Sequence, residues 1–312
     1  MASKNTSVYA ALVVNLLIAA TKFIAGGITR SSAMISEGIH SMVDSTNQLL
    51  LLYGLKQSKR PPDKNKPFGY GKELYFWSFM VSVLIFGLGG GLSMYHGIHF
   101  LIEPHELGDP TMNYVVLGLS IVFELVSSWF ALKEFNAARG DLNWWRAIKT
   151  SKNPITFLVL FEDLAAVAGL FIVLVFTGLT QWLQMPVLDG VASILVGLLL
   201  GAVAIFLGLE SRSLLMGEGI APETQKEICA LVESDPAVLK TIHVLSTYQS
   251  PESVILMLVV AFENDLTTLD INTAVERIRG NVKEAYPYAE FVVIQPQMLT
   301  KPTSAATLES VK

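Results

Sequence analysis

Residues 155–179 read ITFLVLFEDLAAVAGLFIVLVFTGL, and the only charged side chains in this run are those of Glu162 and Asp163. A helix needs about 20 mostly apolar residues to cross the roughly 30 Å hydrocarbon core of a bilayer. The run meets that length, so we predict that it crosses a membrane. Its two acids have no basic residue nearby in the sequence to neutralise them.

Five other apolar stretches have a similar length, and they lie near residues 8–28, 33–56, 74–101, 112–133 and 186–210. Of the 312 residues, 52% are hydrophobic and 16% are charged, whereas a soluble domain carries about 25% charged residues. We expect an all-α membrane domain of six transmembrane helices in a lipid bilayer, over residues 1–212. The formal charge of -5 includes no basic cluster, so nucleic acid is not an expected partner.

The connections between the predicted helices differ in charge. The second and fourth connections are rich in Lys and Arg, whereas the third is acidic and the fifth has no charge. The positive-inside rule places basic loops in the cytoplasm. We therefore expect both chain ends to be cytoplasmic, with the protein in a bacterial inner membrane.

After Arg212 the pattern changes to that of a soluble domain, over residues 213–298. Helical periodicity spans about 222–234 and 267–285, and strand-like runs cover 239–248, 253–262 and 290–295. This order predicts a small α+β, ferredoxin-like cytoplasmic domain with its helices on one face of a sheet. Residues 299–312 are rich in Ser, Thr and Ala and predict a disordered tail.

Charged residues at membrane depth are the candidates for function, because each costs about 2.5–3.5 kcal/mol to insert. His40 and Asp44 lie one turn apart on one helix face, where two ligands can bind one cation. Cys229 is the only cysteine, which leaves His and carboxylates as metal ligands. His40 taken alone is also compatible with a packing histidine.

Asp163 would supply a second carboxylate to His40 and Asp44, a reasonable tetrahedral set for Zn²⁺ if one further ligand is found. Glu162 and Asp163 point about 100° apart on a helix, so one ion is not expected to take both, and we favour Asp163 as ligand. Glu162 and Glu124 are candidate additional ligands or proton carriers.

Three other features have structural interpretations. Glu37 and Asp189 lie near predicted helix starts, where an acid favours the helix dipole. Gly87 and Gly91 have the small-xxx-small spacing that lets two helices pack closely. We expect none of these residues to contact the metal.

Four stretches together resemble the cation diffusion facilitator family, because their order along the chain is specific. They are Ser36 to Asn47, the loop Pro62 to Lys72, Glu162 to Val167, and Asp189 to Gly197. The Glu-Asp pair and the Tyr95-His96-Gly97 stretch are most similar to the zinc transporter 9 branch. The resemblance implies a homodimer that exports divalent metal from the cytoplasm in exchange for protons by alternating access.

The family's central site implies the ligand pair His40 and Asp44, and a His-x-x-x-Asp pair that ends at Asp163. Val159 stands where the second histidine would be. This departure leaves the fourth ligand open and favours a more oxygen-rich site, for Zn²⁺ or for Mn²⁺, Fe²⁺, Co²⁺ or Ni²⁺.

Two accessory metal sites of the family also lack ligands here. Lys66 and Tyr70 replace histidines near Asp63, and in the C-terminal domain only His243 matches a ligand position. We expect that domain mainly to dimerise.

Two other functions are alternatives to transport. One is a metal sensor or scaffold that does not transport, and the other is an intramembrane metal-dependent hydrolase, for which the sequence has no GxSxG or HExxH motif. We expect no enzymatic activity, no catalytic residue and no prosthetic group, with the metal ion as substrate.

Overall fold

The computed structural model describes residues 2–104, 109, 111–140, 143, 144, 147, 148 and 151–298. The chain divides into two compact units, Met1–Met216 and Gly217–Lys312. The tail predicted over residues 299–312 lies outside the described residues.

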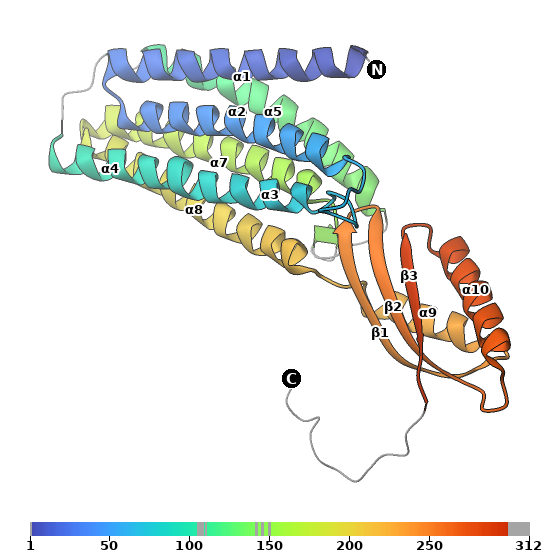
Figure 1. Ribbon diagram of the computed structural model, residues 1–312. Helices are drawn as coiled ribbons and strands as arrows, with labels where there is room; N and C mark the ends of the chain where they lie inside the picture. Colours follow the sequence, from blue (N-terminus) through green and yellow to red (C-terminus); the bar gives the residue numbers. More distant parts are fainter. Residues whose placement is uncertain are drawn as a thin grey trace, which may run out of the picture. The chain divides into compact units, whose positions relative to one another are not determined.

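The described part of the first unit is helical, and its long helices run side by side (Figure 1). Residues 73–102 form one continuous segment that contains a π-helical stretch, η1. All six runs predicted from the sequence coincide with helical segments. The elements are α1 (Ala2–Thr29), α2 (Ser32–Ser58), α3 (Glu73–Leu84), η1 (Ile85–Gly91), α4 (Leu92–Ile102), α5 (Thr111–Arg139), α7 (Pro154–Leu183) and α8 (Val187–Met216).

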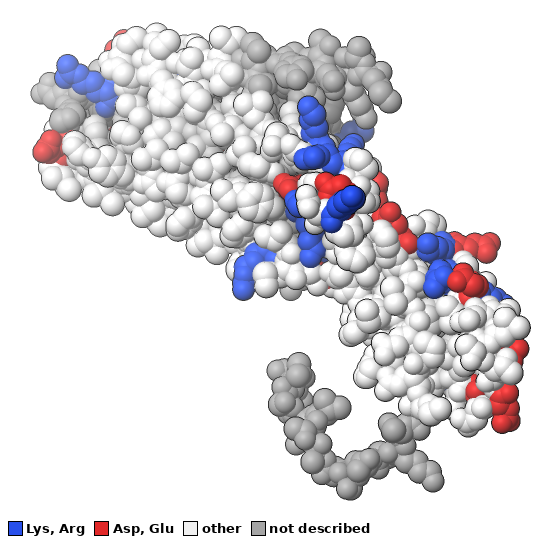
Figure 2. Space-filling view, viewed as in Figure 1, with Lys and Arg blue, Asp and Glu red and all other residues white. Residues whose placement is uncertain are grey.

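The outside of this helical unit is apolar, as expected for a membrane protein. Large apolar side chains such as Leu119, Trp129 and Phe130 are more than half exposed. Figure 2 shows few Asp, Glu, Lys or Arg side chains along the helices. Among the residues that the structure describes, four segments are long and apolar enough to cross a bilayer, namely Glu73–Ile102, Thr111–Ala137, Pro154–Leu183 and Val187–Met216. The polar residues of α2 lower its hydropathy, so the count of six crossings stays a prediction.

Glycine contacts join α8 to the segment made of α3, η1 and α4. A Cβ atom on Gly97 would lie 2.7 Å from the carbonyl oxygen of Gly190, and one on Gly90 would lie 3.1 Å from that of Gly197. The prediction for Gly87 was wrong, since a Cβ there meets no atom within 4 Å, and one on Gly91 would meet only its own helix. The π-helical turn holds more residues than an α-turn, which changes the residues that face α8.

The second unit has the predicted order α-β-β-α-β. Its elements are α9 (Pro222–Glu233), β1 (Val238–Ser250), β2 (Ser253–Phe262), α10 (Thr268–Ala285) and β3 (Phe291–Pro296). The sheet order is β1-β2-β3, with β1 antiparallel and β3 parallel to β2. The sequence predicts that the helical unit ends at Arg212. Helix α8 continues to Met216, so the helical unit ends there instead.

One sheet face and the two helices share a single core. Alternate residues of β2, among them Leu256 and Leu258, pack against Ile228 of α9 and Ile278 of α10. A capping box between Thr267 and Asp270 fixes the start of α10. The core is therefore complete within residues 217–298.

Replacing Arg277 with Met should lower the free energy of unfolding of residues 217–298 at pH 7 by a modest amount, because the Arg277 side chain is half exposed. Arg277 donates to both carboxylate oxygens of buried Asp235, at 2.6 and 2.7 Å. These hydrogen bonds hold the pKa of Asp235 below its usual range. Such a shift stabilises the fold above the unfolded pKa of about 3.9, and the stabilisation is lost as the pH falls through the folded pKa.

Denaturation of this fragment between pH 3 and 8 measures the effect. The difference between Arg277→Met and the parent should be constant above about pH 5 and shrink below about pH 4. Lys283→Met, a matched loss of charge on the exposed side of α10, serves as control. A difference that did not change with pH would contradict the assignment.

Candidate metal centre

Helix α2 carries a polar face made of Glu37, His40, Ser41, Asp44 and Asn47. These positions recur every three or four residues, so they lie along one side of the helix. The residues are buried, with exposed fractions of 0% for Glu37, 2% for His40 and 0% for Asn47. The only exception is Asp44, whose side chain is 13% exposed. The least apolar helix of the unit therefore turns its polar side inward.

His40 and Asp44 lie together within this polar face. The Nδ1 atom of His40 is 3.4 Å from Oδ1 of Asp44. Neither ring nitrogen of His40 has a hydrogen-bond partner among the described residues, and the same holds for Oδ1 of Asp44. Buried polar atoms without partners are costly. The pair is therefore a candidate for binding a further group.

Glu162 is the acid of α7 that meets the polar face of α2. The amide of Asn47 donates to Oε1 of Glu162 at 2.7 Å. The carboxyl groups of Asp44 and Glu162 are close enough to share a hydrogen bond. His40, Asp44 and Glu162 are thus neighbours, although they come from helices far apart in the sequence.

Asp163 points to another helix, α5. The hydroxyl of Ser127 donates to Oδ2 of Asp163 at 2.8 Å. Glu124, one turn before Ser127 on α5, lies within electrostatic range of Asp163. Glu162 and Asp163 therefore diverge as predicted, but the acid that faces α2 is Glu162. The assignment of Asp163 as a ligand stays a prediction.

The described side chains do not yet form a metal site. No group of three or more His, Cys, Asp or Glu residues among them is close enough to hold one ion. His40 lies beside Asp44, and Asp44 lies beside Glu162, but the three side chains do not converge on one point. Binding a cation there therefore requires side chains or helices to move.

Lys22 on α1 is a buried cation that was not among the residues predicted from the sequence. Its ammonium group donates to Oε2 of Glu37 at 3.1 Å and to Oγ of Ser41 at 2.8 Å, and the side chains of Lys22 and Glu37 are 0% exposed. The dipole interpretation of Glu37 was wrong, because that acid lies in the second turn of α2 and pairs with Lys22. A lone lysine within the apolar run 8–28 was the available signal.

Asp189 has the structural role expected of it. It lies in the first turn of α8, and it also holds the start of α2. Its carboxylate accepts from the hydroxyl of Ser31 at 2.7 Å and from the backbone N–H of Ala33 at 3.0 Å. Ser31 is itself the N-cap of α2. Asp189 therefore satisfies donors at a buried helix end.

In the loop between α2 and α3, the three residues at the accessory metal-site positions, Asp63, Lys66 and Tyr70, lie close together. Tyr70 donates to Asp63 at 2.6 Å, and the ammonium of Lys66 lies 4.4 Å from the centre of the Tyr70 ring. In the second unit, His243 is exposed on β1, opposite Val259. In the loop, hydrogen bonding and cation–π contact thus connect Asp63, Lys66 and Tyr70.

Comparison with known proteins gives one family match and several relatives. Residues 8–216 match the model of the cation efflux transmembrane domain. The proton-coupled zinc antiporter SLC30A9, mitochondrial, of Xenopus laevis is 38% identical over 239 residues, which are 76% of this chain and 42% of that protein. The protein of the same name from Homo sapiens is 36% identical over 238 residues, with the same coverage of 76% and 42%.

A third relative matches almost end to end. The manganese efflux system protein MneP of Bacillus subtilis is 25% identical over 296 residues, which are 91% of this chain and 92% of that protein. By contrast, the chain spans about two-fifths of the length of the two SLC30A9 proteins.

Asp189→Ala should lower the stability of the whole protein by about 1–2 kcal/mol, because it removes an acceptor from a buried helix start. Thermal unfolding in detergent would show the loss, and Asp189→Asn should retain part of the stability. Metal affinity measured on the folded protein should not change. A loss of metal binding at an unchanged melting temperature would instead make Asp189 a ligand.

Proposed function

The chain belongs to the cation efflux family, the cation diffusion facilitators, and from this premise we propose that it exports a divalent transition-metal ion from the cytoplasm in exchange for protons. The family consists of metal transporters. The observation that supports the proposal is the buried polar face of α2, in which the ring nitrogens of His40 have no hydrogen-bond partner among the described residues; His40 lies beside Asp44, and Asp44 beside Glu162. An imidazole and two carboxylates at membrane depth are a ligand set for a dication.

The ligands of the transported ion are His40, Asp44 and an acid of α7. Glu162 is the acid in contact with α2 in this conformation, so it replaces the missing histidine at Val159 most directly. Asp163 joins the site if α7 rotates, and Glu124 lies on the same side as Asp163. Metal binding displaces protons from these groups, because ligands bind metal in their deprotonated form. Reprotonation from the opposite side then releases the metal.

Zn²⁺ is the first choice of substrate, with Mn²⁺, Fe²⁺, Co²⁺ and Ni²⁺ as alternatives. Two relatives carry zinc in their names and one carries manganese. One imidazole with several carboxylates suits both borderline and harder cations. The metal is therefore assigned as a class, with zinc favoured.

Six helices cross the membrane, and both chain ends lie in the cytoplasm. The loop between α2 and α3 and the end of α5 carry most of the basic residues near helix ends, whereas Arg30 is the basic residue between α1 and α2. Basic loops stay in the cytoplasm. The N-terminal end of α2 then faces outward. The bacterial inner membrane stays a prediction, since two relatives are named mitochondrial.

The protein forms a homodimer through its second unit. One face of the sheet exposes Leu245, Met257 and Val293, with exposed fractions of 58%, 36% and 47%. The three residues are neighbours across the strands. Adjacent exposed apolar side chains are typical of an interface.

A sensor that binds metal without transport, and a hydrolase, remain the alternative functions. Measured ion flux separates both of them from a transporter.

His40→Ala and Glu162→Gln should each lower metal-stimulated proton flux in proteoliposomes by about ten-fold or more, because each removes a ligand. Asp163→Asn should have a smaller effect if Glu162 is the α7 ligand, and a larger effect would favour Asp163. Glu103→Gln, at an exposed helix end, is the control. Full flux in a protein with both His40→Ala and Asp163→Ala would contradict the predicted site.

Met257→Glu combined with Leu245→Glu should convert the dimer into a monomer, because four charges would then meet in one apolar interface. Light scattering in detergent measures the mass. Leu269→Glu, on α10 and 75% exposed, places a charge on a different surface and should leave the dimer intact. A dimer that persists in the double variant would exclude this sheet face.

A further inference from the structure

Lys22 is unusual among the basic residues of the chain because it is buried in the membrane unit. Its exposed fraction is 0%, and it is the only Lys or Arg that is buried among the described residues. A charged group in hydrocarbon is stable only when it is paired and hydrogen-bonded. The pairing of Lys22 must therefore be kept, or exchanged for another, whenever the helices around it move.

Both partners of Lys22 lie on the polar face of α2, toward its N-terminal end. Glu37 is one turn before His40, and Ser41 follows His40 directly. In the proposed orientation this is the outer end of the metal site, while Asn47 and Glu162 lie on the cytoplasmic side. The ammonium group also lies within electrostatic range of His40, Asp44 and Glu124. Its contact with Ser41 is level with His40, and its contact with Glu37 lies one turn further toward the outer surface.

We propose that the ion pair of Lys22 and Glu37 is the outer gate of the transport path, closed in the conformation seen here. The proposal rests on the proposed function for its direction. A fixed ammonium group repels a dication, so metal at His40 cannot leave outward while Lys22 holds its place. The gate opens when α1 separates from α2 at this pair.

The second oxygen of Glu37 gives a way to open the gate. Oε2 accepts from Lys22, but Oε1 has no partner among the described residues. This free oxygen points toward α7, where a Cβ on Gly169 would lie 2.9 Å from it. A metal ion that moves outward from His40 can compete with the ammonium group for Glu37. If the metal ion replaces the ammonium group of Lys22, the carboxylate of Glu37 is never buried without a cation beside it, which would be costly.

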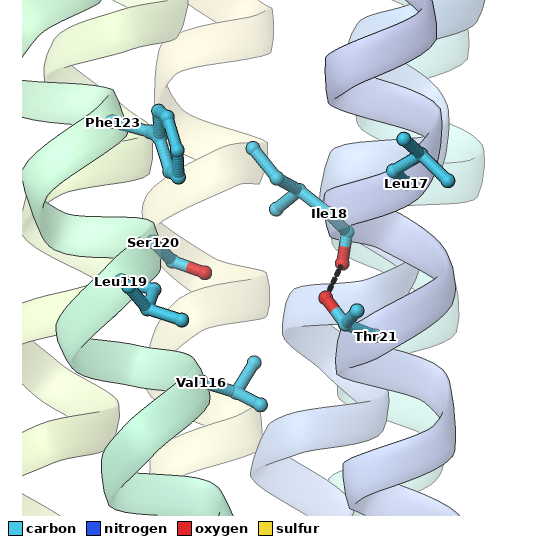
Figure 3. Close-up of a pocket in the computed structure, with 7 residues that line it drawn as sticks. All are labelled: Leu17, Ile18, Thr21, Val116, Leu119, Ser120 and Phe123. Atoms are coloured by element: carbon cyan, nitrogen blue, oxygen red, sulfur yellow. Dashed lines mark hydrogen bonds between the residues drawn. The ribbon is translucent and has the colours of Figure 1, made fainter.

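Helix α1 has room to move on its other side. An apolar pocket of about 270 Å³ lies between α1 and α5. Figure 3 shows its lining, in which Ile18 and Thr21 of α1 face Ser120 and Phe123 of α5. Thr21 directly precedes Lys22, so a shift of α1 toward α5 would draw the ammonium group away from Glu37.

Thiol labelling from each side of the membrane tests the gate without requiring transport. Cys229 is the only cysteine, so Cys229→Ser gives a background without thiols. Ser45→Cys then reports on the path inside the gate, because Ser45 is buried and bonds only within its own helix, to Ser41 O at 3.0 Å. The probe is a membrane-impermeant maleimide, applied to sealed vesicles of known orientation.

Lys22→Glu should raise labelling of Ser45→Cys from the outer face about ten-fold or more, because two acids then face each other. Lys22→Glu combined with Glu37→Lys should restore slow labelling, because the pair is rebuilt in reverse. Glu37→Gln gives a second test if Lys22→Glu fails to fold. Thr29→Val is the matched control: it removes a different α1 hydrogen bond, to Asn113 at 2.8 Å, and should leave labelling slow.

Slow labelling in both Lys22→Glu and Glu37→Gln would overturn the proposal. Fast labelling in the reversed pair, or an increase only from the cytoplasmic face, would overturn it as well. Labelling needs no metal flux, so a protein that fails the flux test can still pass this one. The two proposals can therefore fail independently.

Discussion

The absence of water inside the membrane is the constraint from which the rest of the helical unit follows. Every polar group placed there must find its partner within the protein. Helix α2 carries five such residues along one side, and Lys22 of α1 and Glu162 of α7 supply most of their partners, while Asp189 of α8 accepts from the start of α2. The packing of three helices around α2 is therefore dictated by hydrogen bonding as much as by shape. Among the described residues, both ring nitrogens of His40 and one side-chain oxygen each of Glu37, Asp44 and Asn47 are left without hydrogen-bond partners.

The sequence predicted the helices and the second unit well, because both depend on local periodicity. Runs such as 155–179 need only length and hydropathy to be recognised, and the strands need only alternation and turns. The direction of a side chain within a bundle is a different matter. Glu162 and Asp163 are adjacent in sequence, and only tertiary packing decides which of them faces α2 and which bonds to Ser127. The glycines that contact α8 are Gly90 and Gly97, and not Gly87 as predicted, because the π-helical turn changes which residues of the segment face α8.

The hydropathy rule averages over a whole run of residues, so it does not single out Lys22. The run 8–28 is apolar enough on average to be taken as a membrane helix, and averaging conceals one charge. The same rule, applied residue by residue, singles out Lys22 as an expensive exception that needs an acid. Glu37 was available as that acid, but its nearness to a helix start offered a simpler explanation. A buried cation on one helix predicts a buried acid on a neighbouring helix, and Glu37 is that acid.

The glycine contacts between α8 and the segment of α3, η1 and α4 affect how the molecule can deform. Where backbone touches backbone, as at Gly97 and Gly190, no side chain can change rotamer to absorb a displacement. We therefore expect these two long segments to move together as one rigid body. Helices α1 and α2 meet in part through the long side chains of Lys22 and Glu37, which can change rotamer, so a displacement between these two helices meets less resistance.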